Sequence, residues 1–207
     1  MTTLRIGVLA DTHIPHHLPR LPEQVFTTFD QVDLILHAGD LEDEEVLTEL
    51  GHIAPTLAVR GNPHLRYGTL GSPHLPKTIH LNFCGHRLVL VHGRPQLVLG
   101  FLDKVRAYLF RRTNEDLNRD LIAGYQRAFP TADIVVFGHS HRACAQRVGR
   151  TLFFNPGAVC RTRREPNPSV GLLTIGPTGV EADIIPLTEL LRNQVFPKNL
   201  VSEERFK

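Results

Sequence analysis

Five short apolar runs, each ending on polar residues, constrain the fold of this chain more than any other feature. Two stretches that predict helices, residues 23–31 and 42–50, separate the first three runs. Strand and helix that alternate with short links predict a parallel sheet with helices packed on it. The runs are residues 4–10, 33–40, 55–62, 86–93 and 133–139.

The second half of the chain has a different pattern. Residues 97–129 predict two helices broken near residues 112–114, which we interpret as a helical insertion. We expect this insertion to be a structural scaffold. Two other roles are possible alternatives: it could shape the substrate entrance, or it could form a subunit contact in a homo-oligomer. No segment resembles a linker, so we expect one domain over residues 1–207, with a loose tail after residue 187. Three pairs of apolar segments predict hairpins at residues 78–93, 143–157 and 169–187.

Composition narrows the class of protein. Hydrophobic residues make up 42% of the chain and charged residues 21%, which is typical of a globular protein in water. The net charge of +2 is too small to indicate nucleic-acid binding, and no basic stripe is visible. No apolar run approaches the about 20 residues of a membrane span. The three cysteines lack CxxC spacing, so we expect free thiols and a cytoplasmic location.

The polar residues that end the five runs suggest a ligand site. Ligands of open α/β sheets bind outside the carboxyl ends of strands, so these groups are expected to converge. The Asp-x-His and His-x-His spacings place two side chains of one strand end in the same direction. The candidate metal ligands are Asp11, His13, Asp40, Asn62, His92, His139 and His141.

The chemistry of this set favours two metal ions. Nitrogen and oxygen ligands without cysteine suit manganese, iron, zinc or nickel better than a structural zinc site. Seven ligands are too many for one ion. They suit two ions about 3.5–4 Å apart that share a carboxylate, and Asp40 is the natural bridge. Each motif alone is more often a turn or a hydrogen-bonded histidine, and only their joint occurrence indicates a site.

The order of these motifs resembles that of the calcineurin-like metallophosphoesterases. The segments VRGN (59–62), GHSH (138–141) and NPGA (155–158) resemble the small single-domain YfcE-like phosphodiesterases. That branch includes the metallophosphoesterase-fold subunit of retromer, whose opening is similar to residues 11–16. The resemblance covers residues 4 to about 186.

The resemblance implies a fold and two metal sites. The fold is an α/β class with four layers, α/β/β/α, in which two mixed sheets face one another and helices lie outside. Asp11, His13, Asp40 and His141 would hold the first metal. Asp40, Asn62, His92 and His139 would hold the second.

The resemblance also implies an activity. We expect a metal-dependent phosphoesterase, first of all a phosphodiesterase, that hydrolyses a small phosphate ester with two divalent transition-metal ions. Asp40 and Asn62 are the residues expected at the reaction centre. Manganese is the first expectation, with iron, nickel or zinc as alternatives. A phosphomonoesterase on the same site and a catalytically weak protein-interaction scaffold of the same fold stay open, and the complete ligand set favours the enzyme.

One departure from the family pattern affects catalysis. Many relatives have a histidine after Gly-Asn that assists the leaving group, and Pro63 stands there in this chain. His64 is one residue further and is a candidate substitute, while a solvated loop histidine is the simpler interpretation.

Two arginines are candidates for substrate contacts. Arg94 follows the ligand His92 closely and could reach a phosphate oxygen, although a solvent-facing arginine explains it as well. Arg161, with Arg163 and Arg164, could steer an anionic substrate from a loop near the metals, or form a solvated loop without such a role.

Overall fold

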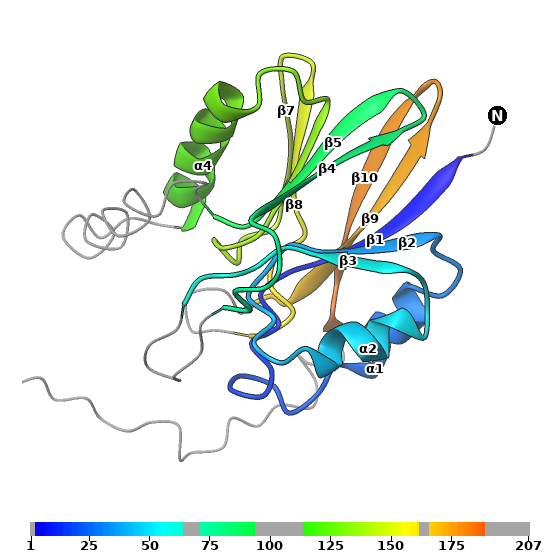
Figure 1. The fold of residues 1–207 in the computed structure, drawn as a ribbon, viewed down its shortest axis with the longest axis vertical. Helices are drawn as coiled ribbons and strands as arrows, with labels where there is room; N and C mark the ends of the chain where they lie inside the picture. The colour runs from blue at the N-terminus through cyan, green and yellow to red at the C-terminus, as the bar shows by residue number, and fades with distance from the viewer. Residues whose placement is uncertain (1–2, 64–70, 94–113, 162–165, 189–207) are drawn as a thin grey trace, which may run out of the picture.

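The computed structural model describes residues 3–63, 71–93, 114–161 and 166–188 (Figure 1). Within them two five-stranded sheets face one another, and helices lie on the two outer faces. The first sheet contains β1 (Leu4–Leu9), β2 (Leu34–His37), β3 (Thr56–Ala58), β9 (Ser169–Gly176) and β10 (Gly179–Pro186). The second contains β4 (Thr78–Phe83), β5 (His86–Val91), β6 (Ile134–Phe137), β7 (Cys144–Val148) and β8 (Thr151–Asn155). The helices are α1 (Glu23–Thr28), α2 (Glu45–Gly51) and α4 (Asn114–Ala128).

The first sheet has the order β10-β9-β1-β2-β3. Strands β1, β2 and β3 are parallel, as the alternation of strand and helix predicts. The hairpin of β9 and β10 adds antiparallel to β1, with Ile6 opposite Leu173. The mixed sheet that the resemblance implies is confirmed, and the hairpin predicted at residues 169–187 is confirmed as β9–β10.

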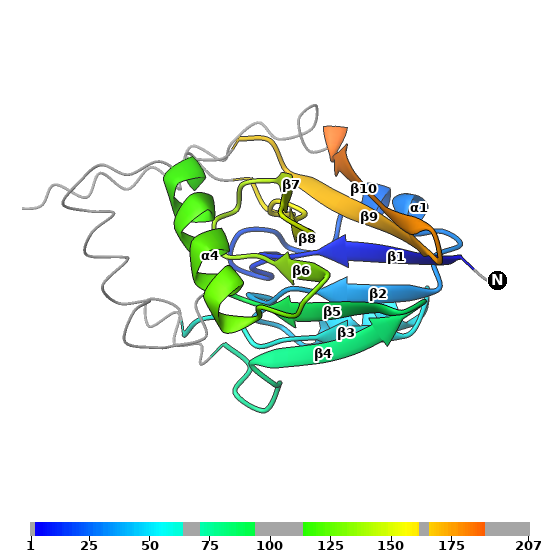
Figure 2. The same ribbon diagram turned by 90° about the horizontal axis from the view of Figure 1, so that it is seen from above.

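The second sheet has the order β4-β5-β6-β8-β7. Its centre, β5, β6 and β8, is parallel, and β4 and β7 pair antiparallel at the two edges. The hairpins predicted around Cys84-Gly85 and Gly149-Arg150 are confirmed as β4–β5 and β7–β8. In Figure 2 the arrowheads of β1, β2 and β5 point to the same end of the molecule, so the carboxyl ends of both sheets meet there.

Apolar residues fill three spaces between the layers. Ile6 and Leu36 of the first sheet face the second sheet, where Leu90 and Val136 belong to the same cluster. Helices α1 and α2 cover the outer face of the first sheet, and α4 covers the outer face of the second (Figure 1). The four-layer α/β/β/α sandwich is confirmed.

Helices α1 and α2 are shorter than the predictions, and α1 ends at Thr28 rather than at residue 31. Helix α2 starts at Glu45 rather than at Glu42, because Glu42 has a φ of 67°, outside the helical region. Helix α4 starts at Asn114, where the second helix of the insertion was expected. Residues 97–113 and the tail beyond residue 188 lie outside the described residues. No described helix is both long and apolar enough to span a bilayer.

Candidate metal centre

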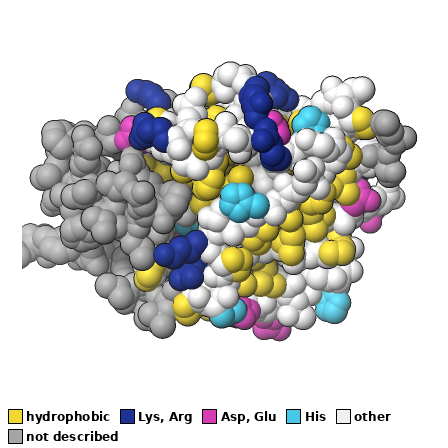
Figure 3. Space-filling view, turned by 45° about the horizontal axis from the view of Figure 1, so that its top comes forward, with side chains coloured by type: hydrophobic (Ala, Val, Ile, Leu, Met, Phe, Trp, Pro, Cys, Tyr) yellow, Lys and Arg dark blue, Asp and Glu magenta, His cyan; other side chains and the backbone are white. Residues whose placement is uncertain are grey.

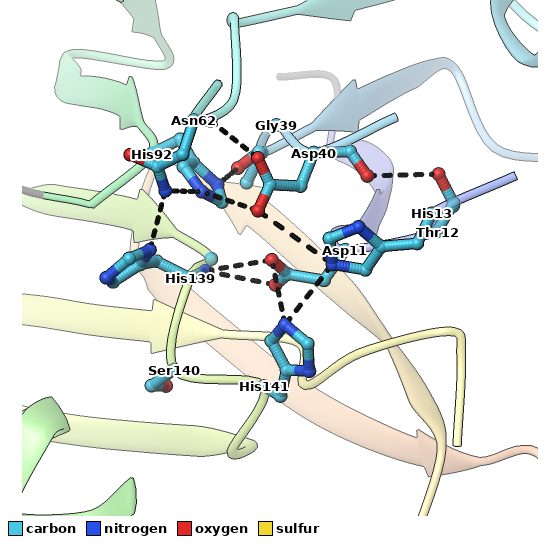
Figure 4. A network of polar contacts seen from close by, with 12 residues as sticks. Asp11, Thr12, His13, Gly39, Asp40, Asn62, His92, His139, Ser140 and His141 are labelled. Atoms are coloured by element: carbon cyan, nitrogen blue, oxygen red, sulfur yellow. Dashed lines mark hydrogen bonds and ion pairs between the residues drawn. The ribbon is translucent and has the colours of Figure 1, made fainter. Parts of the chain in front are cut away.

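The structure brings all seven predicted ligands to one end of the two sheets (Figure 4). Asp11 and His13 follow β1, Asp40 follows β2, and Asn62 follows β3. From the second sheet, His92 follows β5, while His139 and His141 follow β6. The predicted convergence of strand ends therefore holds across both sheets.

Asp40 lies at the centre of the group. Its Oδ2 atom is 3.2 Å from His92 Nε2 and 3.8 Å from His13 Nε2. Its Oδ1 atom accepts the backbone N–H of Asn62 at 2.6 Å. The Asp40 side chain is 3% exposed, so this carboxylate is removed from water and contacts ligands of both predicted sites.

On one side of Asp40, three side chains meet around one point. His13 Nε2 lies 3.3 Å from His141 Nε2, and His141 Nε2 lies 3.5 Å from Asp11 Oδ1. The Asp11 carboxylate also accepts the backbone N–H of His139, at 3.0 Å from Oδ2. These spacings are those of donors that can share one cation.

On the other side of Asp40, the Asn62 amide lies between two imidazoles. Its Nδ2 atom is 3.0 Å from His92 Nε2 and 2.8 Å from His139 Nδ1. A half-turn of the amide offers Oδ1, a metal ligand, to the same point. Asp40, Asn62, His92 and His139 are thus near enough to one another to hold a second cation.

Two histidines are held through one ring nitrogen, which leaves the other for a metal. His92 Nδ1 donates to the Ala38 carbonyl at 2.7 Å. His13 Nδ1 donates to Glu42 Oε1 at 2.6 Å, and His16 Nε2 lies 3.2 Å from Glu42 Oε2. Such outer partners orient metal-binding histidines. Sequence reasoning missed Glu42, because an acidic residue before a helix is typical of a first turn.

Much of the backbone of the centre lies in the left-handed region. Nine described non-glycine residues have a positive φ, and five of them are predicted ligands. This conformation costs on the order of 1–3 kcal/mol per residue, and such strain gathers at functional sites. The five ligands are Asp11, His13, Asp40, His139 and His141.

Gly61 allows the third strand end to approach Asp40. A Cβ atom there would overlap Asp40 Oδ1 and the Asp40 backbone nitrogen. Glycine is therefore required for the Asn62 N–H to reach the carboxylate.

A buried histidine outside the ligand set ties the first two strand ends together. His37 Nδ1 accepts the Gly39 N–H at 3.2 Å, so its proton is on Nε2, 3.3 Å from Thr12 Oγ1. Thr12 Oγ1 in turn lies 3.4 Å from the Leu41 carbonyl. Burial lowers the pKa of His37 to about 3, so the ring is neutral. His37 is therefore a buried, hydrogen-bonded histidine of the core.

Helix α4 supports the two strand ends of the second sheet. The Tyr125 hydroxyl donates to the Gly93 carbonyl at 2.6 Å. Asn118 Oδ1 accepts the Ser140 hydroxyl, and Asn118 Nδ2 donates to the Arg142 carbonyl at 3.0 Å. Helix α4 thus holds the loops that carry His92, His139 and His141 through these hydrogen bonds.

Burial and neighbouring charges shift the pKa of three groups in the cluster. Burial raises the pKa of Asp11 to about 7; attraction to His92 opposes this rise, and repulsion from the nearby Asp40 carboxylate adds to it. Burial lowers the pKa of His92, but attraction to Asp40 and Asp11 outweighs it and raises that pKa to about 9. Burial lowers the pKa of His141 to about 3, which leaves its ring nitrogen free to bind a metal. Buried carboxylates are costly unless positive charge offsets them.

The donor chemistry therefore fits divalent cations at two adjacent points. Asp11, Asp40 and His92 each offer an atom within 4.8 Å of the others. His13, His141 and Cys160 form a second such group. Sequence reasoning missed Cys160, since a single cysteine without CxxC spacing carries no metal signal.

Of the other residues predicted for catalysis and substrate binding, only Arg161 lies among the described residues. Pro63 is exposed, and His64 and Arg94 lie outside the described residues. Arg161 is partly buried in the loop after β8, and Arg163 and Arg164 are also outside the described residues. Roles for His64, Arg94 and Arg161 stay predictions.

Comparison with known proteins gives one family. A model of the calcineurin-like phosphoesterase superfamily domain matches residues 4–177. A protein of Methanothermobacter thermautotrophicus named "probable metallophosphoesterase" is 33% identical over 180 residues, 87% of this chain and 91% of that protein. A phosphodiesterase of Methanocaldococcus jannaschii is 23% identical over 167 residues, 76% of this chain and 85% of that protein.

A solved structure has the same fold. Wild-type Vps29 of Entamoeba histolytica, in complex with zinc, matches with a TM-score of 0.63 and 21% identity. The match covers 88% of this chain and 99% of that chain.

Proposed function

The chain belongs to the calcineurin-like phosphoesterase superfamily, and from that premise we propose that it hydrolyses a small phosphodiester with two divalent transition-metal ions. The observation that carries the proposal is the central position of Asp40, whose Oδ2 atom lies 3.2 Å from His92 Nε2 and 3.8 Å from His13 Nε2. A carboxylate in contact with both ligand groups suits a bridge between two ions.

The proposal assigns the seven residues to two metal positions. Asp11, His13, Asp40 and His141 would hold the first ion, and Asp40, Asn62, His92 and His139 the second. When bound, divalent ions lower the pKa of water and offset the negative charge that develops during attack on phosphorus. Manganese remains the first expectation for the metal, with iron, nickel or zinc as alternatives.

The chain's own residues hold this geometry. Glu42 fixes the ring of His13, and the Ala38 carbonyl fixes the ring of His92. Asp11 accepts the N–H of His139, which holds the loop after β6 against the end of β1. Charged groups therefore need little rearrangement when an anionic ester binds, which is the condition for electrostatic catalysis.

Pro63 limits the leaving groups that the site can serve. It follows Asn62 at the position where many relatives carry a histidine, and it has no proton to transfer. Without a general acid there, we expect faster turnover of aryl or cyclic esters than of alkyl esters. His64 and Arg94 remain candidates for help with the leaving group and the phosphate.

The charge pattern supports a small ester rather than a nucleic-acid polymer. In the face shown in Figure 3, the Lys and Arg side chains of the described residues lie in separate groups with apolar surface between them. A polymer-binding protein usually presents a continuous basic stripe. The expected cytoplasmic location is part of the same proposal, because free thiols are typical of a reducing compartment.

A panel of substrates and metals tests the proposal. Metal-stripped protein is reloaded with Mn, Ni, Zn or Mg and assayed on bis(4-nitrophenyl) phosphate, 4-nitrophenyl phosphate and an alkyl diester. We expect turnover of the aryl diester with transition metals, its loss in Asp40→Ala and His139→Ala, and normal turnover in the control His52→Ala, which lies at the exposed end of α2.

Each other outcome has a defined meaning. Preference for the monoester would replace the diesterase with a phosphomonoesterase. Bound metal without turnover of any ester would favour the protein-interaction scaffold.

A further inference from the structure

Cys160 lies within the candidate metal centre. Its Sγ atom, a ring nitrogen of His13 and a ring nitrogen of His141 all lie within 4.8 Å of one another. A buried cysteine is usually a small apolar residue, and Cys160 does pack in the apolar cluster below the first sheet. Its sulfur, however, also lies beside two imidazoles that the proposed function assigns to a metal.

The backbone holds Cys160 in this place. The preceding residue, Val159, donates its N–H to the Ala10 carbonyl at 3.1 Å, directly before the ligand Asp11. Ser169 donates its N–H to the Ala158 carbonyl at 2.9 Å. Cys160 is fully buried, with 0% exposure, so the surrounding residues fix the position of its side chain.

The distances suit a shared ion. Nitrogen ligands lie about 2.0–2.1 Å from a zinc-sized ion and sulfur about 2.3 Å, so two ligands of one ion are up to about 4.4 Å apart. The Cys160 sulfur and one ring nitrogen each of His13 and His141 all lie within 4.8 Å of one another, so one ion can reach all three with small side-chain rotations.

We propose that Cys160 is a ligand of the first metal ion, with Asp11, His13, Asp40 and His141. This inference rests on the proposed function, because it adds a donor to a centre that the proposal already contains. The first position would then have sulfur, nitrogen and oxygen donors, and the second only nitrogen and oxygen donors. Sulfur favours zinc, iron or cobalt over manganese or magnesium, so the two positions would differ in metal preference.

Cobalt(II) provides a direct spectroscopic test. Metal-stripped protein is loaded with Co²⁺, and its absorption is compared between wild type, Cys160→Ser and the matched controls Cys84→Ser and Cys144→Ser. We expect a thiolate-to-cobalt charge-transfer band in the near ultraviolet in the wild type and both controls. Cys160→Ser should lose this band and keep the visible ligand-field bands of bound Co²⁺.

The outcomes separate this inference from the proposed function. A wild-type protein with ligand-field bands but no charge-transfer band, or a Cys160→Ser variant that keeps the charge-transfer band, would overturn the role of Cys160 alone. Wild-type protein that binds no Co²⁺ at all would overturn the metal centre itself.

A second measurement needs no variant, in case Cys160→Ser does not fold. X-ray absorption at the zinc edge of zinc-loaded wild-type protein should show a sulfur neighbour at about 2.3 Å beside the lighter nitrogen and oxygen neighbours. A zinc environment with nitrogen and oxygen alone would contradict the inference.

Discussion

At the scale of single residues, the centre depends on neighbours that fix each ligand in one orientation. His92 is held by the Ala38 carbonyl and His13 by Glu42, each through the ring nitrogen that faces away from the cluster. A ring that cannot turn presents its other nitrogen at a defined point, and loss of such a partner typically weakens metal affinity 10- to 100-fold.

Glu42→Gln should therefore weaken metal binding. The amide keeps an acceptor for His13 Nδ1 but loses the negative charge, so we expect about a tenfold rise in the dissociation constant of the first metal. Chelator competition measures this, and Glu45→Gln, at an exposed position in α2, is the control. Equal affinity in Glu42→Gln and wild type would show that Glu42 does not position His13.

Gly61→Ala should reduce metal binding more strongly than Glu42→Gln. The new methyl group has no space beside Asp40 Oδ1, so the Asp40 carboxylate or the chain at Asn62 has to move. We expect loss of at least one bound ion, measured by elemental analysis after loading. Gly51→Ala is the control, because nothing lies within 4 Å of its added carbon. Full metal content in Gly61→Ala would show that the close packing of residue 61 against Asp40 is not needed for metal binding.

At the scale of elements, helix α4 holds two of the loops that carry candidate metal ligands. Its residues Asn118 and Tyr125 hold the loops after β6 and β5. The loops after β1, β2 and β3 are held instead by contacts with each other, such as the N–H of Asp11 on the Gly39 carbonyl at 3.0 Å. The two sheets therefore position their ligands in different ways.

Asn118→Ala should loosen the loop that carries His139 and His141. The buried Ser140 hydroxyl and the Arg142 carbonyl lose a partner, which costs about 1–3 kcal/mol of unfolding free energy. Metal affinity should fall as well, and urea unfolding with chelator competition measures both quantities. Gly124→Ala on the same helix should instead gain about 0.5–1 kcal/mol, since nothing lies within 4 Å of its added carbon. Unchanged metal affinity in Asn118→Ala would show that helix α4 does not position the loop that carries His139 and His141.

Asp133, directly before β6, links this strand to β5 and to the turn between β7 and β8. Its carboxylate accepts the Arg87 backbone N–H at 2.9 Å and Arg87 Nε at 3.1 Å, and Arg150 Nη2 lies 3.6 Å away. Hydrogen bonds from Arg87 lower the pKa of Asp133 below its ordinary value. The unfolded chain therefore takes up a proton first as pH falls, so the stabilisation is complete above about pH 4 and is lost as pH drops through the folded pKa.

The variant Asp133→Asn tests the direction of this pH dependence. We expect the unfolding free energy to drop by about 0.5–1 kcal/mol near neutral pH, a modest value because both arginines are partly exposed to solvent. The difference from wild type should shrink as the pH is lowered below about 4. Glu181→Gln on exposed β10 serves as the control in urea unfolding. If the difference in unfolding free energy grew as the pH was lowered, the folded state would not lower the pKa of Asp133.

At the scale of the whole molecule, the sequence predicts the candidate metal ligands more clearly than it predicts how the two sheets pack. Each ligand stands directly after an apolar run, so the position of Asp11 or His139 is visible locally. The facing of the sheets is not visible, because buried strands such as β6 are apolar on both sides and give no direction. Glu42 and Cys160 carry no local signal of a metal site, and only the packed fold brings them to His13.

The two halves of the molecule repeat one arrangement. Asp33, before β2, accepts the Arg5 backbone N–H at 2.7 Å, just as Asp133, before β6, accepts that of Arg87 at 2.9 Å. Both pairs join parallel strands whose carboxyl ends supply ligands. The site is therefore a property of the complete sandwich, and neither sheet alone contains both ligand groups.

Metal stoichiometry tests the central claim most directly. Metal-stripped protein is loaded with Mn²⁺ or Zn²⁺, freed of excess metal and measured by elemental analysis together with protein concentration. Two ions per chain in the wild type, and a loss of both in Asp40→Ala, are expected because Asp40 contacts both ligand groups. A wild-type content of one ion or none, or an Asp40→Ala variant that keeps two, would contradict the two-metal centre.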